Sequence, residues 1–353
     1  MKKIGIVTII DNDNYGNRLQ NYALYKYCSS KYNYDVETLI NEAYSNDKRF
    51  FFIRCLKNYL LKNKYKIINN DKRTECFEKF NLNIKFSKTK INCFSQLDNY
   101  EYLIVGSDQV WNPYFRRLRD LDLLVGTKNS KRISYAASFG VNNIPENKSK
   151  KMIKELKKFK KVSVREKKGK EIIENLEIRD DVEILIDPTM LLCAEEWDKV
   201  VKKPEQLDSD KKYILNYFLG NLSEDRKHEI ERIAKNNNCE IINILDKNSP
   251  FYQTGPSEFL YLEKNAFLIC TDSFHSSVFA ILYNKPFIVF DREDGTVKMN
   301  SRIENLISKF ELKDRMYEGK ITENNLKNDY NQAYKILECE RLKSKKFLDE
   351  ALN

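Results

Sequence analysis

The residues best suited to acid–base chemistry stand between an apolar run and a helix-like stretch, in Cys270-Thr271-Asp272-Ser273-Phe274-His275-Ser276-Ser277. An imidazole titrates near neutral pH and serves as acid or base, and the first turn of a helix favours a bound anion. The chain has only two histidines, and His228 lies in a charged helical pattern. We therefore expect His275 to be catalytic, with Ser273 and Ser276 as contacts of an anionic substrate that donates a group to be transferred. A histidine that caps or packs is the structural alternative.

A second polar loop, Gly106-Ser107-Asp108-Gln109-Val110-Trp111, follows the apolar run at 102–105. A carboxylate there can accept a proton or a hydrogen bond from a sugar hydroxyl, and an indole can stack on a sugar ring. We expect Asp108 to be catalytic, with Ser107, Gln109 and Trp111 binding the acceptor. An Asx-type turn with Trp111 in the core is the alternative. The loop lacks the G-x-S-x-G spacing of a serine hydrolase.

The loop after the first apolar run ends in Tyr15-Gly16-Asn17-Arg18, where a helical pattern starts. Glycine lets a ligand approach the backbone closely, and free amides at a helix start favour an anion. The absence of G-x-G-x-x-G argues against a dinucleotide. We expect Tyr15, Gly16, Asn17 and Arg18 to bind the substrate that accepts the transferred group. The alternative is a turn glycine beside a solvent-facing arginine.

Three further cations are candidates for binding an anionic donor. Arg165 follows a short apolar run and can hold a carboxylate or phosphate with two hydrogen bonds, although neighbouring Glu166 also suggests a plain ion pair. Lys285 precedes an apolar run, and Arg302 opens a helical pattern. We expect all three to contact the donor, with a solvated loop lysine as the alternative for Lys285.

Short apolar runs alternate with amphipathic stretches along most of the chain, which predicts an α/β protein with parallel sheets. Asp187-Pro188-Thr189 interrupts this alternation, which then restarts near residue 213. We expect two Rossmann-like, doubly wound domains facing a crevice, because ligands bind at the carboxyl ends of such strands. We expect the first domain to comprise residues 1–190, to bind the substrate that accepts the transferred group, and to carry a basic helical insertion at about 48–90. We expect the second domain to comprise residues 191–353, to bind the substrate that donates the group, and to end in a helix at 331–352.

The charge of this 353-residue chain is concentrated in one segment. Residues 48–90 hold 13 Lys and Arg against 3 Asp and Glu, which matches the +10 excess of the whole chain. One basic patch suggests docking to an anionic surface, such as a membrane or a lipid-phosphate carrier, rather than nucleic-acid binding. The aromatic residues interleaved there suit a helix lying on a membrane, and an ordinary amphipathic helix is the alternative. No apolar run is long enough to span a bilayer.

Eight cysteines are spread along the chain without C-x-x-C spacing, and two histidines offer no zinc pattern. We expect no metal, no cofactor and a cytoplasmic location, where thiols stay reduced. The protein then works as a cytoplasmic enzyme, at the inner face of the membrane if the basic segment docks there.

Several segments together resemble the polysaccharide pyruvyl transferase family. They occur in order between about residues 1 and 310, and they are Asn14-Tyr15-Gly16-Asn17-Arg18-Leu19-Gln20-Asn21-Tyr22-Ala23-Leu24, Ile104-Val105-Gly106-Ser107-Asp108-Gln109-Val110-Trp111-Asn112-Pro113, Ile133-Ser134-Tyr135-Ala136-Ala137-Ser138-Phe139-Gly140, Ser163-Val164-Arg165-Glu166, Ile186-Asp187-Pro188-Thr189 and Thr271-Asp272-Ser273-Phe274-His275. The resemblance implies a glycosyltransferase-B-like fold and transfer of a pyruvyl group from phosphoenolpyruvate to sugar hydroxyls as a ketal.

The resemblance also implies roles for single residues. His275 matches the catalytic histidine of the family, and Arg165 and Lys285 match donor-binding positions. Some members have arginine where Ser273 stands, and many have glycine where Ser276 stands. Arg302 would then compensate for the missing arginine.

The predicted function is therefore transfer of pyruvate to a sugar of a surface polysaccharide (capsule or exopolysaccharide) or its lipid-linked precursor. A nucleotide-sugar glycosyltransferase of the same fold is one alternative, but apart from Glu304 the second domain offers no acidic residue placed to contact a ribose. A non-catalytic glycan-binding protein is the other. The acceptor sugar, the ketal geometry and the oligomeric state do not follow from the sequence.

Overall fold

A computed structural model describes residues 1–41, 64–91, 93–115, 120–208, 211–293 and 301–353. The chain forms two compact units. The first unit comprises Met1–Lys48, Asn81–Leu192 and Glu338–Asn353, and the second comprises Arg49–Phe80 and Cys193–Leu337.

A seven-stranded sheet forms the centre of the first unit, and every neighbouring pair of its strands is parallel. Its order is β3-β2-β1-β4-β5-β6-β7, so the direction of winding reverses between β1 and β4. Ligands of open parallel sheets bind beyond the carboxyl ends of the strands at such a reversal. The strands are β1 (Lys3–Val7), β2 (Asp35–Asn41), β3 (Phe86–Ile91), β4 (Tyr102–Val105), β5 (Arg132–Ala137), β6 (Lys161–Val164) and β7 (Glu183–Ile184).

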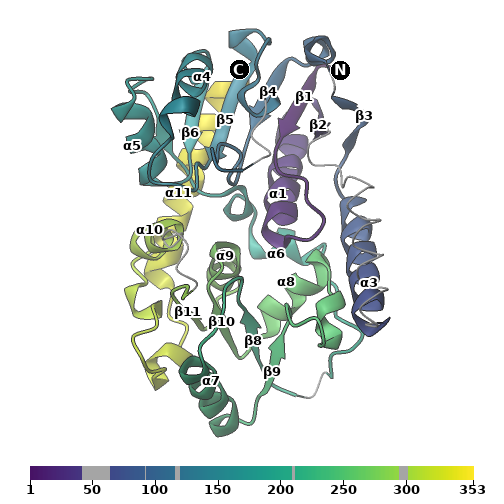
Figure 1. Cartoon of the computed structure of the whole chain (residues 1–353), viewed down its shortest axis with the longest axis vertical. Coiled ribbons are helices and arrows are strands. Elements are labelled where there is room, and N and C mark those ends of the chain that lie inside the picture. Colours follow the sequence, from purple (N-terminus) through teal and green to yellow (C-terminus); the bar gives the residue numbers. More distant parts are fainter. Residues whose placement is uncertain (42–63, 92, 116–119, 209–210, 294–300) are drawn as a thin grey trace. The chain divides into compact units, whose positions relative to one another are not determined.

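Helices cover both faces of this sheet, which explains the nearly continuous apolar runs of its strands. The side chains of α4 (Glu146–Leu156) and α5 (Lys167–Asn175) join one core cluster with residues of β4 and β6. On the other face, α1 (Tyr15–Lys31) runs along β1 and β2 (Figure 1). The Phe347 ring of α11 (Asn331–Leu352) packs there against the Tyr135 ring of β5 at 6.4 Å.

The second unit has a four-stranded parallel sheet in the order β11-β10-β8-β9, with its reversal between β8 and β10. Residues of α7 form one core cluster with alternate residues of β8, β10 and β11. Aromatic contacts link the opposite face to α8 and α9. The elements are α6 (Ala194–Asp198), β8 (Tyr213–Tyr217), α7 (Glu224–Asn236), β9 (Glu240–Asn243), α8 (Pro256–Asn265), β10 (Leu268–Thr271), α9 (Phe274–Leu282), β11 (Phe287–Val289) and α10 (Ser301–Lys309).

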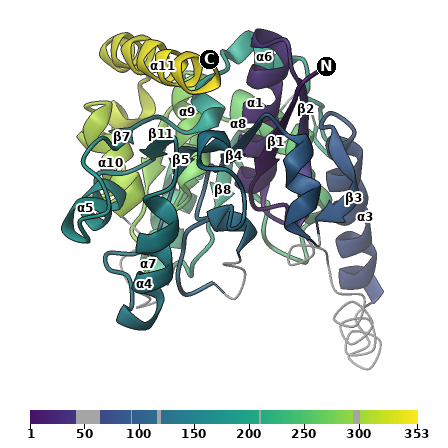
Figure 2. The same cartoon turned by 90° about the horizontal axis from the view of Figure 1, so that it is seen from above.

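Two segments group differently from the sequence-based division. The segment Glu338–Asn353, which includes most of α11, the long yellow helix of Figure 2, belongs to the first unit rather than the second. Tyr32 donates a hydrogen bond to Asp349 at 2.7 Å, and Lys160 donates one to the carbonyl of Ala351 at 2.9 Å. The packing of its buried face on the first sheet, which local sequence does not encode, explains the difference.

The helix α3 (Lys64–Asn81), through Phe80, belongs to the second unit rather than the first. Arg73 of this helix is buried and donates hydrogen bonds to the carbonyls of Tyr252 and Thr254 at 3.2 and 3.3 Å. The basic segment 48–90 was expected to be helical, but its last part is the strand β3, which follows α3. Residues 42–63, which carry most of the predicted membrane-binding pattern, lie outside the described part of the chain.

Candidate functional site

A buried ion cluster lies at the carboxyl ends of three strands in the first unit. Arg165 follows β6, and its two Nη atoms lie 2.8 Å from Asp187 Oδ2 and 3.0 Å from Asp108 Oδ1. Less than a tenth of each of these side chains is exposed. Burial alone would lower the pKa of Arg165, but the charges of Asp108, Asp187 and Glu166 outweigh it and hold that pKa above its ordinary value. The structure thus brings Asp108 and Arg165 together, although the sequence assigns them to different substrates.

The loop that carries Asp108 is fixed by hydrogen bonds across the β1–β4 reversal. The backbone amide of Ser107 donates to Gln20 Oε1 at 3.0 Å, and Gln20 donates in turn to Thr8 at 2.7 Å. The hydroxyl of Ser107 lies 2.8 Å from the carbonyl of Ala136. Ser107 is wholly buried, so it supports the loop rather than presenting a hydroxyl to a substrate.

Trp111 does not stack on a sugar in this structure, which corrects the sequence-based expectation. Its side chain is wholly buried, and its Nε1 donates a hydrogen bond to the carbonyl of Asp122 at 2.9 Å. The indole packs against the rings of Phe139 and Phe159 in the core of the first unit. Gln109 is also buried, and its Oε1 accepts a hydrogen bond from Asn112 at 2.7 Å.

The first turn of α1 is also buried. Tyr15 and Arg18 have no exposed surface, and Asn17 is 5% exposed. Arg18 donates hydrogen bonds to the carbonyl of Ile9 at 3.0 Å and to Asn81 at 3.2 Å. Burial lowers the pKa of Arg18 to about 9. These side chains and Gly16 form the connection between the first strand and α1. The alternative of a solvent-facing Arg18 is therefore wrong, because this side chain is wholly buried.

In the second unit, His275 is the second residue of α9 and directly follows the β10 loop. His275 and Ser273, the N-cap residue, are both buried, with 7% and 3% exposed. The Ser273 amide donates a hydrogen bond to Thr271 Oγ1 at 3.0 Å, which fixes the turn into the helix. The structure therefore places His275 at the positive end of a helix and at the carboxyl edge of the sheet, as the sequence predicts.

Asp272 joins three loops at this edge. Its carboxylate accepts hydrogen bonds from the amides of Leu219 and Gly220, which follow β8, at 2.7 and 2.8 Å. It also pairs with Arg292 Nε, which follows β11, at 3.1 Å. Asp272 and Arg292 are absent from the predicted site residues. The sequence does contain a signal for Arg292. Like the predicted site residues, it is a polar residue shortly after an apolar strand, in Phe290-Asp291-Arg292.

Ser276 and Lys285 do not share the surroundings of His275. The Ser276 hydroxyl donates a hydrogen bond to Glu263 Oε1 at 2.6 Å, and both side chains are wholly buried. Lys285 precedes β11 and lies at the amino edge of the sheet, with the whole of α9 between it and His275. The nine residues of α9 alone span about 13 Å. Burial lowers the pKa of Lys285, but this side chain belongs to the opposite edge of the sheet from His275, which corrects the expectation that the two residues share a site.

Arg302 is the second residue of α10, is partly buried, and shares that first turn with the exposed Glu304. Its contact with a donor stays a prediction. Among the described residues, no three His, Cys, Asp or Glu side chains are grouped as a metal site would require. The seven described cysteines are free thiols.

Solved structures of similar fold include a putative UDP-N-acetylglucosamine 2-epimerase from Listeria monocytogenes, at 13% identity, with a TM-score of 0.50 and coverage of 99% of this chain and 91% of that one. A UDP-GlcNAc 2-epimerase from Neisseria meningitidis bound to UDP-GlcNAc is also 13% identical, with a TM-score of 0.43 and coverage of 97% and 100%. With its two parallel, doubly wound sheets, the chain is an α/β protein of the glycosyltransferase-B-like class.

A family profile narrows this class. The profile of polysaccharide pyruvyl transferases matches residues 14–294, most of the chain, and the chain belongs to that family. No curated protein matches the sequence. No helix in the described part of the chain is both long and apolar enough to cross a membrane.

Proposed function

We propose that this protein transfers the pyruvyl group of phosphoenolpyruvate to hydroxyls of a sugar in a surface polysaccharide or its lipid-linked precursor. Family membership supports a transferase acting in polysaccharide synthesis. The observation that carries the proposal is the position of His275, in the first turn of α9 at the carboxyl edge of a parallel sheet. A helix start favours a doubly anionic donor there.

The proposed reaction begins with protonation of the methylene carbon of phosphoenolpyruvate, which gives an oxocarbenium-like centre. One sugar hydroxyl attacks this centre, phosphate leaves with the C–O electron pair, and a neighbouring hydroxyl closes the ketal. His275 is the proposed general acid and base. Asp108 is the proposed hydrogen-bond partner of the acceptor, and Arg302 is a proposed contact of the donor.

Arg292 joins this proposal as a donor contact. It lies at the carboxyl edge of β11, and its guanidinium is held by Asp272, three residues before His275. A guanidinium that is held in place can donate hydrogen bonds to phosphate without reorganising during the reaction. Docking of residues 48–90 to an anionic membrane belongs to the same proposal, since a lipid-linked acceptor would be presented there.

Histidine substitutions test the assignment directly. We expect His275→Ala to lower phosphoenolpyruvate-dependent phosphate release, measured with a panel of sugar acceptors, by about 10²–10⁴-fold, as for loss of a general acid–base. His228→Ala is the matched control, because His228 is exposed on α7 and is the only other histidine of the chain. Wild-type turnover in His275→Ala would show that another group transfers the proton.

A further inference from the structure

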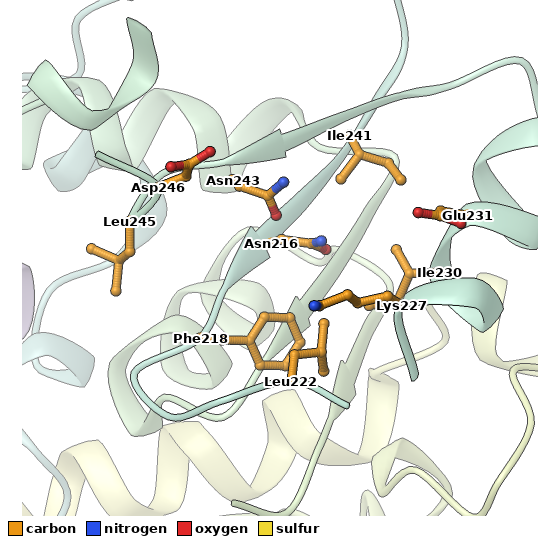
Figure 3. A pocket seen from close by; sticks show the side chains of 10 residues that line it. All are labelled: Asn216, Phe218, Leu222, Lys227, Ile230, Glu231, Ile241, Asn243, Leu245 and Asp246. Carbon is orange, nitrogen blue, oxygen red and sulfur yellow. The ribbon is translucent and has the colours of Figure 1, made fainter. Parts of the chain in front are cut away.

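A pocket of about 630 Å³ lies between α7 and the strands β8 and β9 (Figure 3). Its lining comes from α7, from both strands and from the loops that follow the strands. A single water molecule occupies about 30 Å³, and small-molecule sites are typically about 300–1,000 Å³. The pocket is therefore large enough for an organic ligand.

Asn216 is the polar group on the floor of this pocket. It is 7% exposed, and its Oδ1 has no hydrogen-bond partner among the residues that the structure describes. Ile214 and Asn216 share one face of β8, and Phe218 follows directly after the strand; Ile214 belongs to the apolar cluster beneath α7, and Phe218 packs against that cluster. An asparagine among such neighbours is costly unless something accepts or donates a hydrogen bond to it.

Asn243 places a second amide beside the first. Asn216 and Asn243 are register partners in the parallel ladder of β8 and β9, so their side chains lie on the same face. Figure 3 shows the two amides close together in the pocket. Two neighbouring amides provide both donors and acceptors, which a ligand rich in hydroxyl groups matches.

Apolar side chains flank these amides. The Phe218 ring is partly buried, lines the pocket, and packs edge-on against Phe290 with ring centroids 5.4 Å apart. Leu222 and Ile241, also partly buried, add aliphatic surface. The pocket thus has an apolar surface beside polar amides, and a sugar ring likewise has an apolar C–H face and a rim of hydroxyl groups.

The charges of the lining argue against an anionic ligand. Among the described lining residues, Glu231 and Asp246 are acidic, and the one basic residue is Lys227, whose Nζ lies 2.6 Å from Glu224 Oε1. Phosphoenolpyruvate or a nucleotide diphosphate would therefore meet a surface with no surplus of positive charge. A neutral ligand avoids this penalty.

We propose that this pocket is a binding subsite for a neutral segment of the glycan acceptor, away from the reacting sugar. The inference rests on the proposed function for the identity of the glycan as acceptor, but the site itself is argued from its own lining. In this account, Asn216 and Asn243 bind hydroxyls and Phe218 contacts the apolar face of a sugar ring.

Binding of neutral oligosaccharides tests the proposal. The full-length protein is applied to an array of neutral bacterial oligosaccharides, and the affinity for the strongest binder is measured by calorimetry. Asn216→Leu and Asn243→Ala should each weaken this affinity by about tenfold or more, through lost hydrogen bonds. Asn236→Leu, at the exposed end of α7 outside the pocket, is the control and should bind as wild type does. Leucine suits position 216 because its neighbours on that face are apolar.

Turnover separates this proposal from the proposed function. Asn216→Leu should keep wild-type phosphoenolpyruvate-dependent turnover on a monosaccharide acceptor while KM for a long acceptor rises. Absence of oligosaccharide binding by the wild type, or equal binding by all variants, would overturn the subsite. Loss of phosphoenolpyruvate binding in Asn216→Leu would also overturn it, because the pocket would then serve the donor. Absence of any pyruvyl transfer, with binding still weakened by both variants, would refute only the proposed function.

Discussion

Glu263 of α8 is wholly buried, and its carboxyl group accepts a hydrogen bond from Ser276 of α9, the helix that carries His275. Burial raises the pKa of Glu263 well above its ordinary value of 4.5, and the hydrogen bond from Ser276 only partly opposes this. The folded protein therefore keeps this proton to a higher pH than the unfolded chain does. The contribution of Glu263 to stability is therefore fully present below its pKa in the unfolded chain, and it is lost as pH rises through its pKa in the folded protein.

Glu263→Gln removes this titration while keeping the shape and the acceptor for Ser276. We expect the variant to gain melting temperature over wild type as pH rises from about 4.5 to about 8, and to show little difference at the acid end. Thermal unfolding at a series of pH values measures this. Glu318→Gln, which removes an exposed carboxyl of the same unit, is the control. A difference between Glu263→Gln and wild type that is the same at every pH would contradict the account.

At the scale of elements, the sharp turn after β4 positions the Asp108 loop. Gly106 has φ of 126°, a conformation that residues with a Cβ atom rarely adopt. A Cβ atom there would lie 2.1 Å from the carbonyl oxygen of Tyr135 on β5. The close approach of β4 and β5 thus depends on the absence of a side chain.

Gly106→Ala should lower the free energy of unfolding by about 2 kcal/mol or more, through the combined strain and clash. Gly319→Ala is a matched control, because Gly319 also has a positive φ, of 89°, yet among the described residues, apart from its two chain neighbours, nothing lies within 4 Å of an added Cβ. That control should cost only about 1 kcal/mol. Urea unfolding of both variants compares them, and equal costs would show that contact with Tyr135 is unimportant.

At the scale of the whole molecule, apolar periodicity was enough to predict two α/β units, because each buried parallel strand appears as a short apolar run. Local sequence did not predict that the segment Glu338–Asn353, which includes most of α11, joins the first unit. The sequence does show that Lys285 precedes a strand, and in a parallel sheet this places it at the amino edge, away from His275, so the expectation of a donor contact at Lys285 overlooks a signal that the sequence contains. Trp111 shows a third limit, since an indole suited to a sugar is equally suited to a core.

The candidate site was predictable where chemistry and position coincide. His275 is a rare residue type at a strand-to-helix turn, and the structure confirms that position. Arg165 looked like a donor ligand, but its partners Asp108 and Asp187 come from other strands, 57 and 22 residues away along the chain. Only the folded sheet brings those carboxylates together.

Thermal unfolding with candidate donors tests the central claim most directly. A ligand at 100 times its dissociation constant stabilises a folded protein by about 2.7 kcal/mol. The account predicts that phosphoenolpyruvate raises the melting temperature while UDP-, GDP- and CMP-sugars do not, and that Arg292→Ala weakens the effect. Stabilisation by a nucleotide sugar, with none from phosphoenolpyruvate, would contradict pyruvyl transfer and favour a glycosyltransferase.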